Sequence, residues 1–157
     1  MDDATREGLV SLVLNRRLAA LGTLHDGSPL VSMVLYAARP NLSKLFIHVS
    51  RLALHTGGLL ADPRVGLLIA EADRPNRNPL AMSRVSIQGL AHVLDPHSND
   101  FEEAREVYIN AHPNAAFNFG LGDFLLVGIR PHSARFVAGF GRIVDIDSDD
   151  WARLAGA

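Results

Sequence analysis

LAALGTLHDGSPLVSMVLYA, residues 18–37, is the stretch of sequence that decides the fold. Two apolar runs flank His25-Asp26-Gly27-Ser28, and an Asp-Gly pair between such runs is the strongest short-range signal of a β-hairpin. The stretch therefore predicts a strand over residues 18–25, a tight turn, and a second strand over residues 29–37.

Further strands are indicated downstream of this hairpin. Short apolar runs bounded by turn residues predict strands at KLFIHVS (44–50), RVGLLIAE (64–71) and MSRVSIQGLAHVL (82–94). Residues 124–146 predict two more strands, interrupted at Arg130-Pro131-His132-Ser133.

The strand at residues 82–94 has one polar face, because alternate residues of a strand point to opposite sides. One face carries Val85, Ile87, Gly89, Ala91 and Val93, and the other carries Arg84, Ser86, Gln88 and His92. The polar face must meet water, a second subunit or a ligand.

Three segments predict helices. Residues 3–16 place leucines and valines at helical spacing behind acidic residues that suit a helix N-terminus. Residues 52–61 lie between Ser50, in an N-cap position, and Asp62-Pro63, where a helix must stop. Residues 98–112 begin with Ser98 as a cap and end before Pro113.

These segments do not alternate regularly between strand and helix, which argues against a doubly wound parallel sheet. Many short strands with turn signals favour an antiparallel barrel instead. We expect a mainly β, α+β fold: an antiparallel β-barrel with peripheral helices. A chain of 157 residues suits a single domain over residues 1–157.

Composition excludes several classes of function. A net charge of −2 gives no basic face for nucleic acid, and the absence of cysteine removes disulfides and thiolate metal sites. No apolar run approaches the ~20 residues of a membrane span, and the N-terminus is acidic, so we expect a cytoplasmic protein. The histidines show no metal-ligand spacing, so no metal site is assigned.

The stretch HVSRLALHTGGLLADPRV, residues 48–65, gathers polar side chains at a strand-to-helix turn. His55 and Thr56 lie one turn into the expected helix, and free N–H groups at a helix N-terminus favour an anion. Gly57 and Gly58 each cost roughly 1 kcal/mol in a helix, which indicates a close backbone or ligand. Two interpretations stay open: a phosphate site, or a helix that Ser50 merely caps.

Two residues elsewhere have side chains that bind anions. Arg84 begins the polar face of the strand at residues 82–94, and a guanidinium can grip a phosphate with two hydrogen bonds. Ser32 lies between apolar neighbours in LVSMVL and can donate to an anion. Taken alone, each also suits a simpler role, as a solvated strand-end arginine and a tolerated small residue.

The segment FVAGFGR, residues 136–142, places two glycines around Phe140 and ends in Arg142. Glycine after a strand permits close backbone approach, which suits a flat aromatic ligand or a subunit contact. The segment is not a GxGxxG fingerprint, and no GxSxG nucleophile motif occurs in the chain. No catalytic side chain is assigned.

Four segments taken in order carry a resemblance to a known family: GSPLVSMVLYA, LFIHVSRLALHTGGLLADPRVGLLI, MSRVSIQG and ARFVAGFGR. Together they resemble the pyridoxamine 5′-phosphate oxidase-like, FMN-binding split-barrel family, and in particular its haem-utilisation (HugZ-like) branch. The resemblance implies a six-stranded antiparallel split β-barrel that forms a homodimer and binds FMN in clefts at the subunit interface.

The resemblance also implies the flavin contacts. Strand residues would follow the isoalloxazine ring and ribityl chain, helix residues and Arg84 would hold the phosphate, and the segment after residue 138 would approach from the other subunit. The implied FMN-binding residues are Ser32, Met33, Val34, His48, Val49, Ser50, His55, Thr56, Arg84, Gly139, Phe140 and Arg142.

The resemblance has limits, and three hypotheses stay open: a flavin enzyme, a haem-binding protein and a structural dimer without a cofactor. The vitamin-forming oxidases use arginine and lysine where this chain has Ser32 and His55, so that activity is not implied. The first hypothesis is an FMN-dependent oxidoreductase acting on a small-molecule substrate, in which the flavin carries the chemistry. The alternative is a haem-binding protein that uses the same dimer without flavin, with His132, His112 or His48 as candidate iron ligands.

Overall fold

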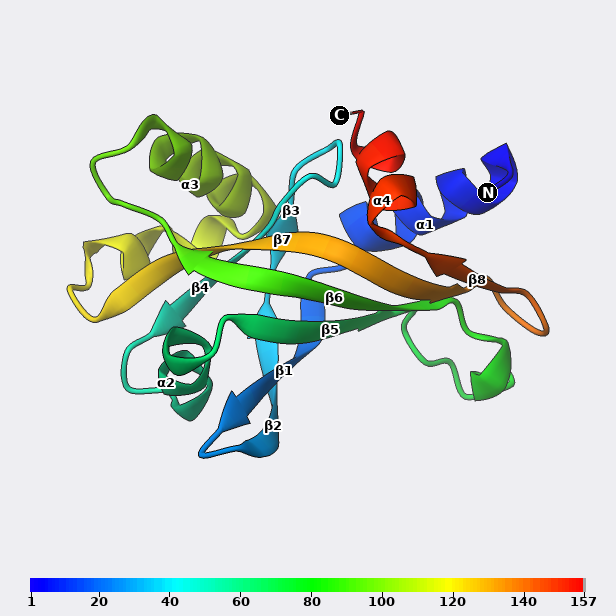
Figure 1. Ribbon diagram of the computed structural model, residues 1–157, viewed down its shortest axis with the longest axis horizontal. Coiled ribbons are helices and arrows are strands. Elements are labelled where there is room, and N and C mark those ends of the chain that lie inside the picture. Colours follow the sequence, from blue (N-terminus) through cyan, green and yellow to red (C-terminus); the bar gives the residue numbers. More distant parts are fainter. Residues whose placement is uncertain (157) are drawn as a thin grey trace.

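The computed structural model describes residues 1–156. Figure 1 shows a curled antiparallel sheet with helices packed around its edges. The helices and strands, in chain order, are α1 (Asp3–Asn15), β1 (Leu18–His25), β2 (Ser28–Leu35), β3 (Ala37–Ala38), β4 (Leu45–Ser50), α2 (Leu54–Ala61), β5 (Arg64–Ala70), η1 (Pro79–Ala81), β6 (Arg84–Val93), α3 (Asn99–Ala111), η2 (Pro113–Gly120), β7 (Phe124–Val137), β8 (Ile143–Ile146) and α4 (Ser148–Ala155).

The expected hairpin is confirmed. β1 and β2 pair from Leu18 opposite Leu35 to His25 opposite Ser28. The two turn residues, Asp26 and Gly27, both have positive φ angles, of 49° and 76°. This backbone matches the right-handed twist of the flanking strands, which explains why Asp-Gly is favoured at such turns.

Within the described residues the strands form one sheet in the order β2-β1-β5-β6-β7-β4-β3, with β8 added to β7. β2 and β3 stand at opposite ends of this order, yet only Tyr36 separates them in the chain. The sheet must therefore curl until its ends meet, which makes a split barrel and confirms the expected fold. The number of strands differs from the expected six, because β3 and β8 are short additional strands.

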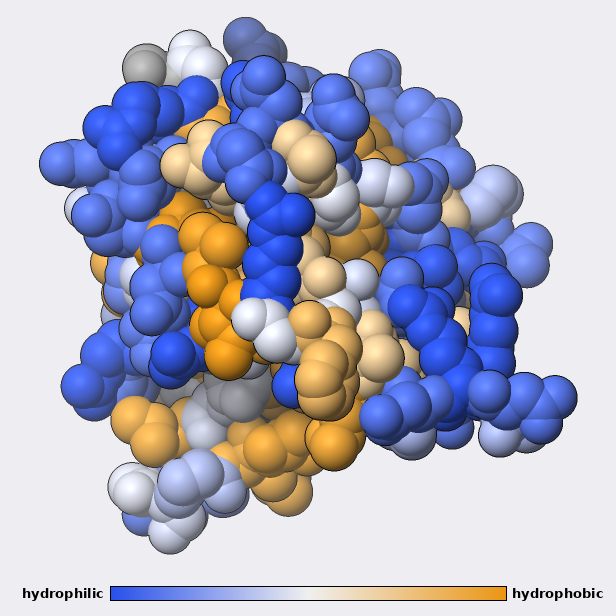
Figure 2. Space-filling model, turned by 90° about the vertical axis from the view of Figure 1, so that its right-hand side faces the viewer, coloured by the Kyte–Doolittle hydropathy of each residue, from blue (hydrophilic) through white to orange (hydrophobic). Residues whose placement is uncertain are grey.

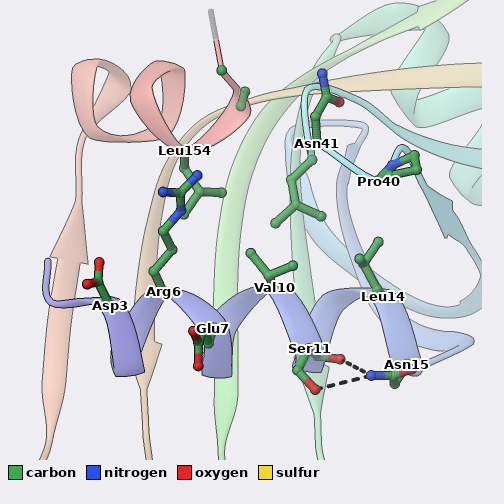
Figure 3. Close-up of a pocket in the computed structure, with 13 residues that line it drawn as sticks. Asp3, Arg6, Glu7, Val10, Ser11, Leu14, Asn15, Pro40, Asn41 and Leu154 are labelled. Atoms are coloured by element: carbon green, nitrogen blue, oxygen red, sulfur yellow. Dashed lines mark hydrogen bonds between the residues drawn. The ribbon is translucent and has the colours of Figure 1, made fainter.

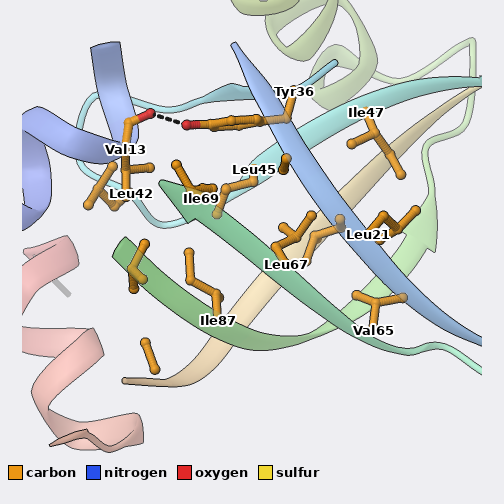
Figure 4. Close-up of a cluster of buried hydrophobic side chains, with 14 of the residues drawn as sticks. Val13, Leu21, Tyr36, Leu42, Leu45, Ile47, Val65, Leu67, Ile69 and Ile87 are labelled. Carbon is orange, nitrogen blue, oxygen red and sulfur yellow. Dashed lines mark hydrogen bonds between the residues drawn. The ribbon is translucent and has the colours of Figure 1, made fainter. Parts of the chain in front are cut away.

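The barrel interior is filled by the inward-facing residues of the strands. Figure 4 shows Leu21, Ile47, Val65 and Leu67 meeting there, and all four are buried. Each fully buried side chain of this kind contributes roughly 1.5–3 kcal/mol. At the edge of this core, the Tyr36 hydroxyl donates to the Val13 carbonyl at 2.6 Å and ties α1 to the barrel.

The expected break at residues 130–133 is wrong, because β7 runs without interruption through Pro131. Pro131 lies opposite Gly89 and Ser133 lies opposite Gln88, so His132 is an extra residue with no cross-strand partner. This arrangement is a β-bulge, a place where a strand tolerates proline. The residues that predicted a turn, 130–133, therefore form a β-bulge instead.

The three predicted helices are present, and the structure adds α4 and the 3-10 helices η1 and η2. Ser98 is the N-cap of α3, and its hydroxyl accepts from the Phe101 amide, as expected. The short helix α4 was not predicted; Asp147 caps it, and the Trp151 indole donates to the Leu42 carbonyl at 3.1 Å. Among the described residues, none of these helices has the length and apolar character needed to span a membrane.

Candidate functional site

The β4–α2 turn, defined here as residues 48–58, contains the polar side chains that suggested an anion site. The Ser50 hydroxyl donates to the Asp123 carboxylate at 2.8 Å and accepts from the Leu52 amide at 3.1 Å. The Thr56 hydroxyl donates to the Ser50 carbonyl at 2.6 Å. These polar groups are therefore already hydrogen-bonded inside the protein.

The helix at this turn begins later than expected. It starts at Leu54 rather than residue 52, and its N-cap is Ala53, which makes no side-chain cap. Ser50 is therefore not the N-cap, because its hydroxyl bonds Leu52 and Asp123 instead. The expected end at Asp62 is confirmed.

The groups left for an anion at this turn are few. Thr56 is fully buried, whereas the side chains of Arg51, Leu52 and Leu54 are exposed. Leu54 and His55 open the helix, so their backbone N–H groups have no partner within it. Burial lowers the pKa of His55, which favours the neutral form of its imidazole. The turn therefore offers an anion two amides, and the exposed Arg51 is its one permanently charged cation.

The glycines of this helix have different surroundings. A Cβ on Gly58 would lie 2.6 Å from the Leu24 carbonyl oxygen, whereas a Cβ on Gly57 would meet nothing within 4 Å. The close approach that the sequence indicated is therefore made at Gly58, by the backbone of β1.

His48 and Val49 face opposite sides of β4. Val49 belongs to the barrel core, whereas the His48 ring stacks on Phe119 with centroids 3.8 Å apart and meets the edge of Tyr108. The buried Nδ1 of His48 has no hydrogen-bond partner among the described residues, and burial lowers its pKa to about 4. The two side chains cannot line the same cleft.

Arg84 lies beside the loop that carries η1, together with Gly139. Its guanidinium donates to the Met82 carbonyl at 3.1 Å, and a Cβ on Gly139 would lie 3.4 Å from the Ala81 carbonyl oxygen. Arg142 is paired with Asp2. Arg84 and Gly139 therefore both lie against the loop that carries η1, and these two residues with that loop are named the loop cluster.

Exposed apolar residues accompany this loop cluster. Phe140 is 81% exposed, and Leu80 and Ile143 are also exposed. Figure 2 shows this end of the molecule, where hydrophobic residues gather between hydrophilic margins.

The two groups of predicted residues lie at opposite ends of the sheet. α2 leads into β5 at Arg64, whereas Arg84 pairs with Ala70 at the other end of β5. At ~3.3 Å per residue these ends are roughly 20 Å apart. One chain therefore does not bring Arg84 to His55 and Thr56, and a clamp built from all three needs a second copy.

The remaining predicted residues lie on β2 and alternate between its two faces. Ser32 and Val34 stand opposite Leu21 and Ala19, whose side chains face the barrel interior. Met33 points outward and is 74% exposed. The predicted residues Ser32, Met33 and Val34 thus do not share one surface.

Met33 belongs to an outer face of the sheet whose β2 edge is apolar. We define the outer face by the outward positions of β2, β1, β5, β6 and β7, namely Val31, Met33, Gly22, Gly66, Leu68, Gln88 and His132. Val31 and Met33 are both more than 70% exposed. Exposed apolar patches of this kind mark ligand or partner surfaces.

Sequence reasoning missed a hollow of about 450 Å³ in this outer face. Its lining includes Gly22, Gly66, Gln88, Arg64 and His132. The signal that could have found it was glycine at outward positions of two strands. Its volume lies within the usual range of small-molecule sites.

A larger groove of about 740 Å³ lies between α1, α4 and the loop before β4. Figure 3 shows Arg6, Val10 and Leu14 of α1 facing Leu154 and Asn41 across it. None of the predicted site residues lines this groove.

Comparison with known proteins places most of the chain in one protein family. The family described as pyridoxamine 5′-phosphate oxidase matches residues 5–138. The chain belongs to this family. The match covers α1 from Thr5 onward, the whole sheet except β8, and the segment up to Ala138.

Relatives within this fold have names that refer to haem. The chain is 35% identical over 122 residues to the chloroplastic heme oxygenase HOZ of Arabidopsis thaliana, covering 78% of this chain and 36% of that protein. It is 24% identical over 144 residues to heme oxygenase HutZ of Vibrio cholerae, covering 86% of this chain and 77% of that protein.

A solved structure supports the fold over nearly the whole chain. A heme-binding protein from Mycobacterium smegmatis superposes with a TM-score of 0.85 at 26% identity, covering 98% of this chain and 62% of that one. The chain thus spans about a third of HOZ and less than two thirds of the mycobacterial protein.

Proposed function

We propose that this member of the family binds haem as a homodimer and acts in haem use, by storage or breakdown. Two relatives are named heme oxygenases, and a third protein of the same fold is named a heme-binding protein. The proposal selects the haem-utilisation alternative over the flavin-dependent oxidoreductase.

The apolar outer face is the observation that carries this proposal. Val31, Met33 and Leu68 expose aliphatic surface beside a hollow that contains an imidazole and a guanidinium. Haem is a flat, largely apolar ring with two carboxylates and an iron that takes a histidine ligand. The outer face offers apolar surface, positive charge and an imidazole together, and it matches each part of haem.

FMN remains a second candidate because the family is described by a flavin-type oxidase. When bound, FMN would supply hydride-transfer chemistry. The N–H groups of Leu54 and His55 would bind its phosphate, and the exposed Leu52 would border it. Because Thr56 and Ser50 are hydrogen-bonded elsewhere, the fit rests on two amides, the His55 imidazole and the exposed Arg51.

The proposed homodimer explains how distant residues would share one site. In one chain Arg84 lies at the opposite end of β5 from the β4–α2 turn. A two-fold partner docked on the outer face would cover Val31 and Met33 and would bring its own loop cluster toward the turn. The small-molecule ligand would then lie between the subunits.

Titration of one purified sample with ferric haem and, separately, with FMN tests the proposed function. We expect a sharp Soret band that saturates at a fixed haem-to-subunit ratio and elutes with a dimer on gel filtration. Co-elution of flavin absorbance with no retained haem would overturn the proposal and support the oxidoreductase. A monomer that binds haem would overturn only the dimer.

A further inference from the structure

A hollow of about 290 Å³ lies between the C-terminal end of α1 and the last turns of α3. Arg16 and Arg17 line it together with Tyr36 and, from α3, Val107 and Ala111. We name it the α1–α3 hollow. Within the described residues no carboxylate lines it, and it includes no residue of the outer face or of the β4–α2 turn.

Tyr36 fixes the backbone that carries the two arginines. Its amide donates to the Arg17 carbonyl at 3.0 Å, and its hydroxyl donates to the Val13 carbonyl at 2.6 Å (Figure 4). Burial raises the pKa of this hydroxyl, although the nearby positive charge of Arg16 opposes the rise. The phenol is therefore neutral, and it does not balance the charge of Arg16.

The charge of the two arginines is not balanced within the described residues. Neither Arg16 nor Arg17 forms an ion pair there. The Arg16 side chain is half-buried, and its Nε is buried without a hydrogen-bond partner. The C-terminal end of a helix carries a charge of about −0.5, which offsets only part of two guanidinium charges.

The neighbouring Arg39 shows how the chain balances an arginine at this helix. One face of α3 carries residues spaced three and four apart, namely Asp100, Glu103, Val107 and Ala111. The two carboxylates bind Arg39 at 2.8 and 2.9 Å, whereas Val107 and Ala111 line the α1–α3 hollow. The same face thus supplies carboxylates to Arg39 and only small apolar side chains beside Arg16.

We propose that the α1–α3 hollow binds a small oxyanion, a phosphate or carboxylate group, through the guanidinium groups of Arg16 and Arg17. A guanidinium is permanently charged, and its parallel N–H groups match two oxygens of such a group. The oxyanion takes the part that Asp100 and Glu103 play for Arg39. This site is separate from the proposed haem site and does not depend on it.

The first test is calorimetric titration of the protein with inorganic phosphate and, separately, with acetate, at an ionic strength held constant with chloride. We expect one of the two anions to saturate at one per chain, which identifies the group that is bound. Arg16→Gln should weaken this binding at least about tenfold, as expected when hydrogen bonds to a charged group are lost. Arg153→Gln, which changes an exposed arginine of α4, is the matched control and should bind as the wild type does.

A second variant supplies the missing carboxylate from the chain itself. Val107→Glu extends the acidic face of α3 by one turn beyond Glu103 and places a carboxylate at the α1–α3 hollow. We expect this side chain to compete with the anion, so that binding is lost while the circular dichroism spectrum stays that of the wild type. If Val107→Glu does not fold, Ala111→Glu makes the same test one turn later.

Two results would overturn the proposal. Heat that does not saturate for either anion would show that water and chloride are enough for these arginines. Binding that is lost in Arg51→Gln but kept in Arg16→Gln would place the anion at the β4–α2 turn instead.

Discussion

The β4–α2 turn and the outer face of the sheet differ in how their polar groups are used. At the turn, the hydroxyls of Ser50 and Thr56 are hydrogen-bonded within the chain, and Thr56 is fully buried. On the outer face, His132 has no partner among the described residues and lies beside a hollow. A dense run of polar residues in a sequence therefore does not identify a binding site. A ligand can bind only those polar groups that have no hydrogen-bond partner within the folded chain.

The comparison predicts that changes at the turn alter folding stability, whereas changes on the outer face alter binding. The largest effect is expected from Gly58→Ala, because the new Cβ would lie 2.6 Å from the Leu24 carbonyl oxygen. We expect a loss of about 3 kcal/mol in the free energy of unfolding, the upper part of the range for overpacking. Urea unfolding measures it.

Gly57→Ala is the matched control, since its Cβ would meet nothing within 4 Å. In the same helix it should stabilise the protein by about 0.5–1 kcal/mol through helix propensity. Equal effects of the two variants would contradict the packing of α2 on β1.

The next effect concerns pH and the buried imidazole of His48. Burial lowers its pKa from 6.5 to about 4 in the folded protein, so the unfolded chain takes up a proton first as the pH falls. Stability should therefore drop between pH 6.5 and 4, and stay level for this group below that. Allowing for partial solvent access, we expect a loss of about 2 kcal/mol.

His48→Phe keeps a ring against Phe119 and removes the titrating group. Unfolding of the variant and the wild type, measured by urea at a series of pH values, isolates the contribution of His48. Parallel pH profiles for the two proteins would show that this imidazole is not desolvated.

A smaller effect is expected from Thr56→Val, which deletes the hydroxyl that donates to the Ser50 carbonyl. The loss of this hydrogen bond should cost about 1 kcal/mol, because the Ser50 carbonyl still accepts from the Ala53 amide. Thr56→Ser retains the hydroxyl and should recover most of this loss in the same unfolding measurement. A Thr56→Val protein that is as stable as the wild type but no longer binds FMN would contradict this prediction. It would show that the β4–α2 turn binds a ligand.

The smallest effect on stability is expected from Met33→Glu on the outer face, where the native side chain is 74% exposed. The unfolding free energy of the single chain should change by less than about 0.5 kcal/mol, as for other surface substitutions. The charge should still weaken the proposed dimer, which gel filtration at several protein concentrations measures. Unchanged mass at every concentration would place the dimer contact elsewhere.

Much of the fold was predictable because its signals are local. The Asp26-Gly27 turn, the Ser98 cap and the alternation of Val85 and Ile87 are all specified by residues close together in the chain. The bulge at His132 was not predicted, because a proline in a strand and a proline in a turn look alike in sequence.

The candidate site was only partly predictable. The sequence drew attention to Arg84 and Gly139, which do share one loop cluster, and the exposed Phe140 accompanies them. It also grouped Arg84 with His55, although the register of β5 and β6 places them at opposite ends of the sheet. Distances along a sheet depend on strand pairing, which sequence spacing does not give.

By itself the sequence determined the barrel: the hairpin, the strand alternation and the family to which the chain belongs. Only the tertiary structure decided which polar groups are free. Ser50 is satisfied by Asp123, a residue 73 positions away, whereas His132 is left without a partner by a bulge opposite Gly89. Hydrogen bonds form between groups that folding brings together. Which polar groups can bind a ligand therefore depends on the folded structure and cannot be read from the order of residues in the sequence.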